Sequence, residues 1–204
     1  MRMLFRFLIG LFLMLPAVAA AATILVFGDS LSAGYGVPLE QGWVRLLERK
    51  LRDEKSDYKI VNASISGETT AGGRTRIAAA LKAHRPAIVI LALGANDGLR
   101  GQNLESMQAN LDAMIEACRR FKSDVLLVGM RLPPNYGPAY TEKFRGVFTA
   151  VARDRKLPVV PFLLDGFAEK YEYFQADGVH PTAQAQPLIA ETMWKALRPL
   201  LKRR

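Results

Sequence analysis

Cysteine and histidine are scarce in this sequence of 204 residues, which has one cysteine, Cys118, and two histidines, His84 and His180. A single cysteine cannot form an internal disulfide, and no group of His, Cys and Asp has the spacing of metal ligands. No Gly-rich phosphate loop and no basic patch interleaved with aromatic residues is present. We therefore expect no metal, no other cofactor and no nucleic-acid partner.

A long hydrophobic run occurs only at the amino terminus. A basic start, an apolar centre and an alanine-rich stretch follow one another at residues 1–6, 7–15 and 17–22. The apolar run before Pro16 is shorter than the roughly 18 residues that a membrane span needs. This pattern predicts a signal peptide over residues 1–21, cleaved somewhere in 19–22, and a periplasmic or secreted domain over 22–204. An uncleaved membrane anchor is the alternative.

Acidic residues are outnumbered, with 19 Asp and Glu against 28 Lys and Arg and a formal charge of +9. Loss of Arg2 and Arg6 with the leader leaves +7. A surplus of this size serves solubility or peripheral contact with an anionic membrane. At this length we expect one domain, and we expect it to be a monomer.

Short apolar runs alternate with helical patterns along the rest of the chain. The runs suited to buried strands are residues 24–27, 58–63, 87–93, 125–130 and 157–162. Helical periodicity covers residues 43–51, 73–83, 104–121 and 140–155, and a last helix is expected from Pro181 toward Leu197. Cys118 lies on an apolar stripe of the third helix and is expected in the core. Strict alternation predicts a single-domain three-layer α/β/α sandwich with a five-stranded parallel sheet.

The first strand delivers Ser30 into a Gly28-Asp29-Ser30 turn, at the sheet edge where active sites of such folds form. A serine nucleophile needs a base, and His180 lies in the turn Asp177-Gly178-Val179-His180-Pro181. A carboxylate three residues before the imidazole can reach Nδ1 and fix its tautomer. Ser30, His180 and Asp177 are therefore the candidate catalytic residues. His84 is expected to be a solvated loop residue on the opposite edge, and Asp29 a brace for the turn.

An attacking serine also requires donors for the oxyanion. Three candidates follow three different strands: the backbone amides of Ser30 and Gly67, and the side-chain amide of Asn96. A glycine admits close approach of substrate, and an asparagine donates a hydrogen bond without adding charge.

These residues resemble the GDSL, or SGNH, hydrolase family. The four blocks are Gly28-Asp29-Ser30-Leu31, Gly67-Glu68-Thr69, Gly94-Ala95-Asn96-Asp97 and Asp177-Gly178-Val179-His180-Pro181. Residues 31–36, 96–101 and 131–137 are similar to the periplasmic branch of multifunctional acyl-CoA thioesterase I, protease I and lysophospholipase enzymes. Ala95 departs from the family pattern, in which many members have a second glycine.

The resemblance implies a flavodoxin-like sheet and an acyl-enzyme route for fatty-acyl esters and thioesters, such as acyl-CoA, lysophospholipids and simple esters. It implies Ser30 as nucleophile, His180 as base, Asp177 as its orienting carboxylate, and Ser30, Gly67 and Asn96 as the oxyanion hole. The substrate-binding residues that we predict are Gly98, Leu99, Arg100, Gly101, Pro134 and Tyr136.

Two other functions remain open at this stage. A short-chain carbohydrate acetyl esterase or O-acyltransferase of the cell envelope would use the same motifs. A non-catalytic, basic envelope-binding module would use the positive charge and the terminal Lys202-Arg203-Arg204, with the strand-end residues serving only as turns.

Overall fold

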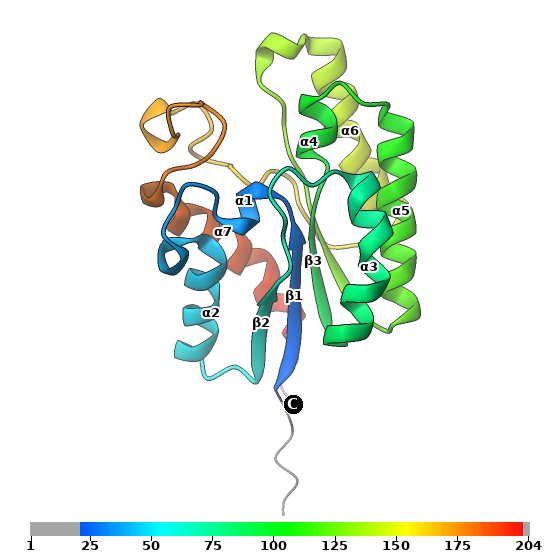
Figure 1. Cartoon of the computed structure of the whole chain (residues 1–204), viewed down its shortest axis with the longest axis vertical. Helices are drawn as coiled ribbons and strands as arrows, with labels where there is room; N and C mark the ends of the chain where they lie inside the picture. The colour runs from blue at the N-terminus through cyan, green and yellow to red at the C-terminus, as the bar shows by residue number, and fades with distance from the viewer. Residues whose placement is uncertain (1–20, 202–204) are drawn as a thin grey trace, which may run out of the picture.

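The computed structural model describes residues 21–201, and the predicted signal peptide lies almost wholly outside that range. Five parallel strands form one sheet in the order β2-β1-β3-β4-β5 (Figure 1). They are β1 (Ala22–Gly28), β2 (Tyr58–Asn62), β3 (Ile88–Ala92), β4 (Asp124–Val128) and β5 (Val159–Val160). The predicted parallel sheet and α/β class are confirmed.

Helices cover both faces of the sheet. One layer holds α2 (Trp43–Asp53) and α7 (Gln186–Leu197), and the other holds α3 (Thr70–His84), α5 (Leu104–Arg120) and α6 (Pro138–Arg155) (Figure 1). Short helices α1 (Ser30–Ala33) and α4 (Ala95–Leu99) follow β1 and β3.

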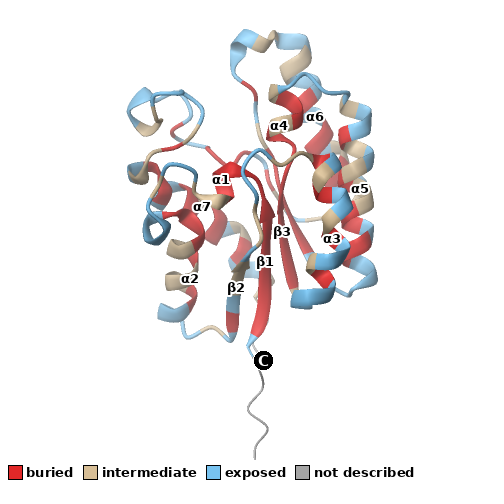
Figure 2. Ribbon diagram, in the orientation of Figure 1, coloured by how far each residue is buried: buried red, intermediate tan, exposed pale blue. Residues whose placement is uncertain are grey.

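The core is divided by the sheet into two apolar clusters. Successive side chains of a strand point to opposite faces, so Ile24 and Val26 of β1 pack toward α2 and α7, whereas Leu25 and Phe27 pack toward α3 and α5. All four are fully buried, and Figure 2 shows the central strands as the most buried part of the molecule. Cys118 is buried in the second cluster, as predicted.

Three expectations from the sequence differ from the structure: the length of β5, the position of His84 and the start of the last helix. β5 is only two residues long, because Pro158 and Pro161 flank it and lack the N–H group that a ladder requires. His84 is exposed but is the last residue of α3, not part of a loop.

The last helix begins at Gln186, not at Pro181. Pro181 instead pairs with Phe174 in an antiparallel bridge, and the N–H of Thr182 donates to the carbonyl of Tyr173. These contacts keep residues 181–182 extended, and a 3₁₀ turn over Ala183–Ala185 precedes the helix. Within residues 21–201, no helix has both the length and the apolar character to cross a membrane.

Candidate active site

Ser30 sits where β1 ends and α1 begins, at the carboxyl edge of the sheet. Asp29 caps α1, since its carboxylate accepts a hydrogen bond of 3.0 Å from the Leu31 N–H. A Cβ on Gly28 would lie 2.7 Å from Ser32 Oγ and 3.1 Å from the carbonyl oxygen of Ala92, so this position has no room for a side chain. The tight turn leaves Ser30 9% exposed and lining a cavity.

His180 reaches Ser30 from the long segment between β5 and α7. Its Nε2 lies 2.9 Å from Ser30 Oγ, and its Nδ1 lies 2.7 Å from Asp177 Oδ2. With the Nδ1–H donating to the carboxylate, Nε2 is free to accept the hydroxyl proton of Ser30. The structure thus brings together the three residues that the sequence singled out.

Asp177 is fixed as an ionised carboxylate. Its Oδ1 accepts the backbone N–H groups of Val179 and His180, both at 2.9 Å. Desolvation alone would raise the pKa of Asp177, but these two backbone hydrogen bonds and the contact with the imidazole outweigh it and lower the pKa to about 2. A negative charge beside Nδ1 is the state that holds the imidazole in the tautomer needed here.

Asn96 and Gly67 lie on neighbouring turns of the same edge. Asn96, in α4, donates from Nδ2 to the carbonyl of Glu68 at 3.0 Å and lies 3.4 Å from Asp29 Oδ2. Gly67 has φ +77°, a conformation that favours glycine. Ser30 and Asn96 line the cavity, whereas Gly67 does not. The short bond to Glu68 fixes one N–H of Asn96 and leaves the other with only the long contact.

Asp29 is a deeply buried carboxylate next to Ser30, with 2% of its surface exposed. Burial raises its pKa to about 6, against the opposing effects of the Leu31 N–H and of His180. The contacts of Asp29 fit the predicted role as a brace for the turn. Its carboxylate accepts hydrogen bonds from the Leu31 N–H and, at 3.4 Å, from Asn96 Nδ2, and it has no hydrogen bond with His180.

A second buried carboxylate, Asp97, was not predicted. It accepts hydrogen bonds from the backbone N–H of Thr70, at 2.9 Å, and from the Thr70 hydroxyl, while Asn110 Nδ2 donates to that hydroxyl at 3.3 Å. These bonds tie α4 to the start of α3 and to α5, and so fix the backbone that carries Asn96. The Asn96-Asp97 pair resembles a turn dipeptide, so the sequence alone carried no signal for this role.

A cavity of about 1020 Å³ opens beside Ser30, Asn96 and His180. Its walls come from the loops after β3, β4 and β5, and they are largely apolar. The apolar lining side chains include Leu31, Leu99, Met130, Leu132, Pro133, Pro134, Phe162, Leu164, Phe167, Phe174 and Val179. Leu99 and Pro134 were predicted to bind substrate. The others were not, because most of them lie in segments whose sequence pattern gives no periodicity.

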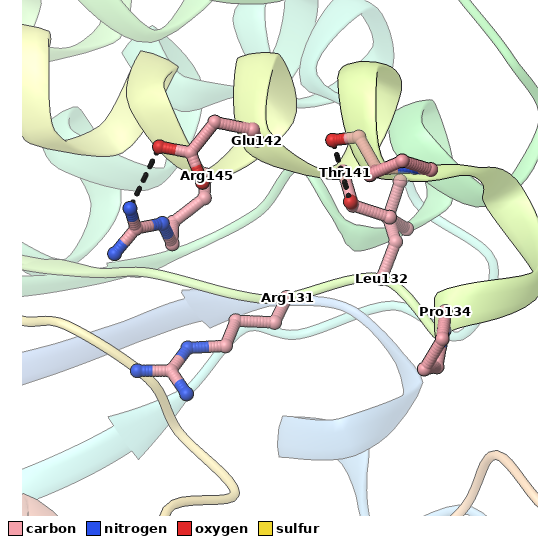
Figure 3. A pocket seen from close by; sticks show the side chains of 7 residues that line it. Arg131, Leu132, Pro134, Thr141, Glu142 and Arg145 are labelled. Atoms are coloured by element: carbon pink, nitrogen blue, oxygen red, sulfur yellow. Dashed lines mark hydrogen bonds and ion pairs between the residues drawn. The ribbon is translucent and has the colours of Figure 1, made fainter.

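A second cavity of about 480 Å³ adjoins the first and shares Arg131, Leu132 and Pro134 with it (Figure 3). In Figure 3, Glu142 and Arg145 lie side by side on α6, which forms one wall of this cavity. They form an ion pair, with 2.7 Å between Glu142 Oε1 and Arg145 Nη2. The guanidinium of Arg131 lies over the ring of Phe162, with its Cζ 4.8 Å from the ring centroid.

The six predicted substrate-binding residues separate into two groups. Leu99 and Pro134 line the main cavity. The others do not line it: Gly98 packs against Phe144, the Arg100 guanidinium donates to the Gly67 carbonyl at 3.0 Å, Gly101 is exposed, and the Tyr136 hydroxyl donates to the Leu99 carbonyl at 3.0 Å. Substrate binding by this loop stays a prediction.

A serine, a histidine and an aspartate linked in this order at the carboxyl edge of a parallel sheet define the class of serine hydrolases. More narrowly, the chain belongs to the GDSL-like Lipase/Acylhydrolase family, whose sequence pattern matches residues 26–187. The predicted family is thereby confirmed.

Two relatives match most of the chain. Esterase TesA of Pseudomonas aeruginosa is 50% identical over 188 residues, which are 92% of this chain and 94% of the relative. Thioesterase 1/protease 1/lysophospholipase L1 of Escherichia coli K12 is 40% identical over 183 residues, 90% of this chain and 86% of the relative.

The solved structures agree with this assignment. The crystal structure of TesA has a TM-score of 0.86 at 50% identity, covering 88% of this chain and 99% of that one. The esterase EstA from Pseudoalteromonas sp., in a structure inhibited by monoethylphosphonate, has a TM-score of 0.84 at 41% identity, covering 89% and 99%.

Proposed function

We propose that this protein hydrolyses fatty-acyl esters and thioesters through an acyl-enzyme on Ser30. Hydrolysis of acyl esters as a class follows from the family and from the esterase and thioesterase names of its relatives. The observation that carries the mechanism is the continuous link from Ser30 Oγ through His180 to Asp177, with separations of 2.9 and 2.7 Å.

The first half-reaction forms the acyl-enzyme. His180 Nε2 takes the hydroxyl proton of Ser30, and Oγ attacks the acyl carbon to form a tetrahedral intermediate. The imidazolium is stabilised by the carboxylate of Asp177. It then returns the proton to the leaving alcohol or thiol as the bond from the acyl carbon to that group breaks. In the second half-reaction, His180 takes a proton from water, and the water oxygen attacks the acyl carbon. The bond to Ser30 Oγ then breaks, His180 returns the proton to Oγ, and the carboxylic acid is released.

The charge on the former carbonyl oxygen requires donors already in place. We assign this role to the backbone N–H groups of Ser30 and Gly67 and to the Asn96 N–H that has only a 3.4 Å contact with Asp29. The bonds that hold Asn96 and the Gly67 turn together support this assignment, because fixed donors need no reorganisation during the reaction.

The volume and apolar lining of the cavity support a fatty-acyl substrate over an acetyl group. An acetyl group would contact only the side chains next to Ser30, whereas the wall extends to Phe162 and Phe167 beyond β5. No observation favours the carbohydrate esterase or the envelope-binding module. We also propose export by a signal peptide to the periplasm or outside the cell, a monomeric state, and peripheral contact with anionic membranes through the positive charge.

Replacement of Ser30 by alanine tests the proposal. We expect Ser30→Ala to lower kcat for p-nitrophenyl octanoate by about 10⁴-fold or more and to abolish labelling by a fluorophosphonate probe. Ser32→Ala is the matched control: Ser32 is buried two residues away but does not line the cavity, so it should keep both activities. Full turnover by a pure Ser30→Ala protein would refute the mechanism. Faster hydrolysis of acetyl than of octanoyl esters would instead favour the short-chain esterase.

A further inference from the structure

The aromatic ring of Tyr35 lies against the imidazole of His180. Their ring centroids are 4.5 Å apart, and the planes meet at 41°. Tyr35 follows α1, five residues after Ser30 in the chain, and it is 54% exposed. It does not line the cavity. A large, half-exposed aromatic side chain thus covers one face of the histidine from outside the substrate-binding space.

Gln175 joins Tyr35 to the segment that carries His180. Its Nε2 donates to the backbone carbonyl of Tyr35 at 2.8 Å and to that of Pro181 at 3.1 Å. Its own backbone N–H donates to the carbonyl of His180 at 2.8 Å. One side chain therefore bonds the loop after α1 to the residue that follows the histidine.

The backbone beside Tyr35 is shaped to admit Gln175. Gly36 has φ +70°, and a Cβ at this position would lie 2.1 Å from Gln175 Oε1. A side chain at position 36 would therefore displace Gln175 as well as strain the backbone.

His180 needs a restraint of this kind because acylation of Ser30 removes the hydroxyl that lies 2.9 Å from Nε2, which leaves the bond to Asp177 to hold the ring. That bond alone gives little support, because the segment between β5 and α7 contains short 3₁₀ turns and the Phe174–Pro181 bridge but no α-helix or strand within residues 161–185. Rotation of the ring about its χ angles would move Nε2 away from Ser30 Oγ, and small displacements of a reacting group lower rates steeply. The Tyr35 ring blocks that rotation on one side.

We propose that Tyr35, held by Gln175, is a positioning residue for His180 that keeps Nε2 directed at Ser30. This inference rests on the proposed function, in which His180 is the base. The ring acts by contact with the imidazole, and no hydrogen bond from the hydroxyl is required.

The test compares Tyr35→Ala with Tyr35→Phe, using p-nitrophenyl butyrate as substrate. Removal of the ring should lower kcat by about 10-fold, leave KM within about twofold, and slow fluorophosphonate labelling of Ser30 by the same factor as kcat. Tyr35→Phe should restore all three values, because the ring is retained. Phe121→Ala is the matched control, since it truncates an exposed aromatic at the opposite edge of the sheet, just before β4.

A second variant tests the link without touching the ring. Gln175→Ala should lower kcat in the same direction by about threefold, and the double variant should lose little more than Tyr35→Ala alone, because both act on one contact. Unchanged kcat in Tyr35→Ala, a rise in KM alone, or equal losses in Tyr35→Phe and Tyr35→Ala would overturn the positioning role. Such results in variants of an active wild type would overturn the role of Tyr35 and leave the role of Ser30 intact. A fully active Ser30→Ala protein would overturn the proposed mechanism and the role of Tyr35 together.

Discussion

The site is built from two halves that differ in how they are held. Ser30, Gly67 and Asn96 lie within a few residues of the ends of β1, β2 and β3. Hydrogen bonds connect these turns to one another, from the Ile65 N–H to the Gly28 carbonyl and from Asn96 to the Glu68 carbonyl, each at 3.0 Å. Asp177 and His180 lie instead in a long irregular segment, in which Asp177 is held by short-range bonds and Gln175 bonds the segment to Tyr35. The proposed donors to the oxyanion are therefore held by bonds between strand ends, while the proposed base, His180, lies in a segment without regular secondary structure.

The two halves also treat a carboxylate in opposite ways. Burial raises the pKa of Asp29 to about 6, and its one short hydrogen bond comes from Leu31. Asp177 has a side chain that is 41% exposed, and its pKa falls to about 2 because three N–H groups outweigh desolvation. The number of donors that face each carboxylate, together with its burial, decides which one can serve as a permanent negative charge beside the histidine.

The largest expected effect in the half that contains His180 comes from replacing the acceptor oxygen of Asp177 with a hydrogen-bond donor. In Asp177→Asn, the side-chain oxygen can still accept the two backbone N–H groups, but the NH₂ group then faces His180 Nδ1 and favours the proton on Nε2. That tautomer cannot accept the proton of Ser30, so we expect kcat to fall by about 10⁴-fold. Asp177→Ala should lose only about 10²-fold, because water can accept the Nδ1–H at this exposed position.

The measurement is kcat for p-nitrophenyl butyrate in both variants, with thermal unfolding to check the fold. Equal losses in the two variants would mean that the charge, and not the tautomer, is what Asp177 contributes.

In the half built on the strand ends, Asn96→Ala removes one of the proposed oxyanion donors. We expect kcat to fall by about 10²- to 10³-fold with little change in KM, because the ground-state carbonyl gains less from this donor than the oxyanion does. Asn135→Ala, at an exposed position that does not line the cavity, is the matched control. A rise in KM as large as the fall in kcat would assign Asn96 to substrate binding instead.

The fold could be predicted from sequence where local pattern and tertiary structure agree. Continuous apolar runs such as residues 88–92 are buried on both faces, and this pattern indicated a parallel strand. The errors arose where tertiary contacts decide the backbone. Pro181 is well suited to a first helical turn, but its pairing with Phe174 keeps it extended.

The meeting of Ser30, Asp177 and His180 could also be predicted, because each lies in a short motif whose geometry is local. Asp177 reaches His180 within one turn of chain, so a spacing of three residues was informative. Tyr35 and Gln175 could not be predicted together, since they are 140 positions apart and only the folded chain brings them into contact. The same holds for the cavity wall, to which Leu99 and Phe174 contribute from separate loops.

The smallest expected effect concerns stability in the half built on the strand ends. Because the folded-state pKa of Asp29, about 6, lies above its ordinary value of 3.8, the folded protein binds more protons than the unfolded chain between these values. The stabilisation present below pH 3.8 is therefore lost as the pH rises toward 6. Asp29→Asn has no proton to lose and can still accept the Leu31 N–H.

The free energy of unfolding in urea at pH 4, 5, 6 and 7 measures this difference. We expect the wild type to lose about 2 kcal/mol more than Asp29→Asn across that range. Asp53→Asn, which removes an exposed charge at the end of α2, controls for the change in net charge. If the free energy of unfolding changed with pH in the same way in the wild type and in Asp29→Asn, the pKa of Asp29 would not be raised in the folded protein. The buried turn at Ser30 would then hold an ionised carboxylate, as the exposed turn at Asp177 does.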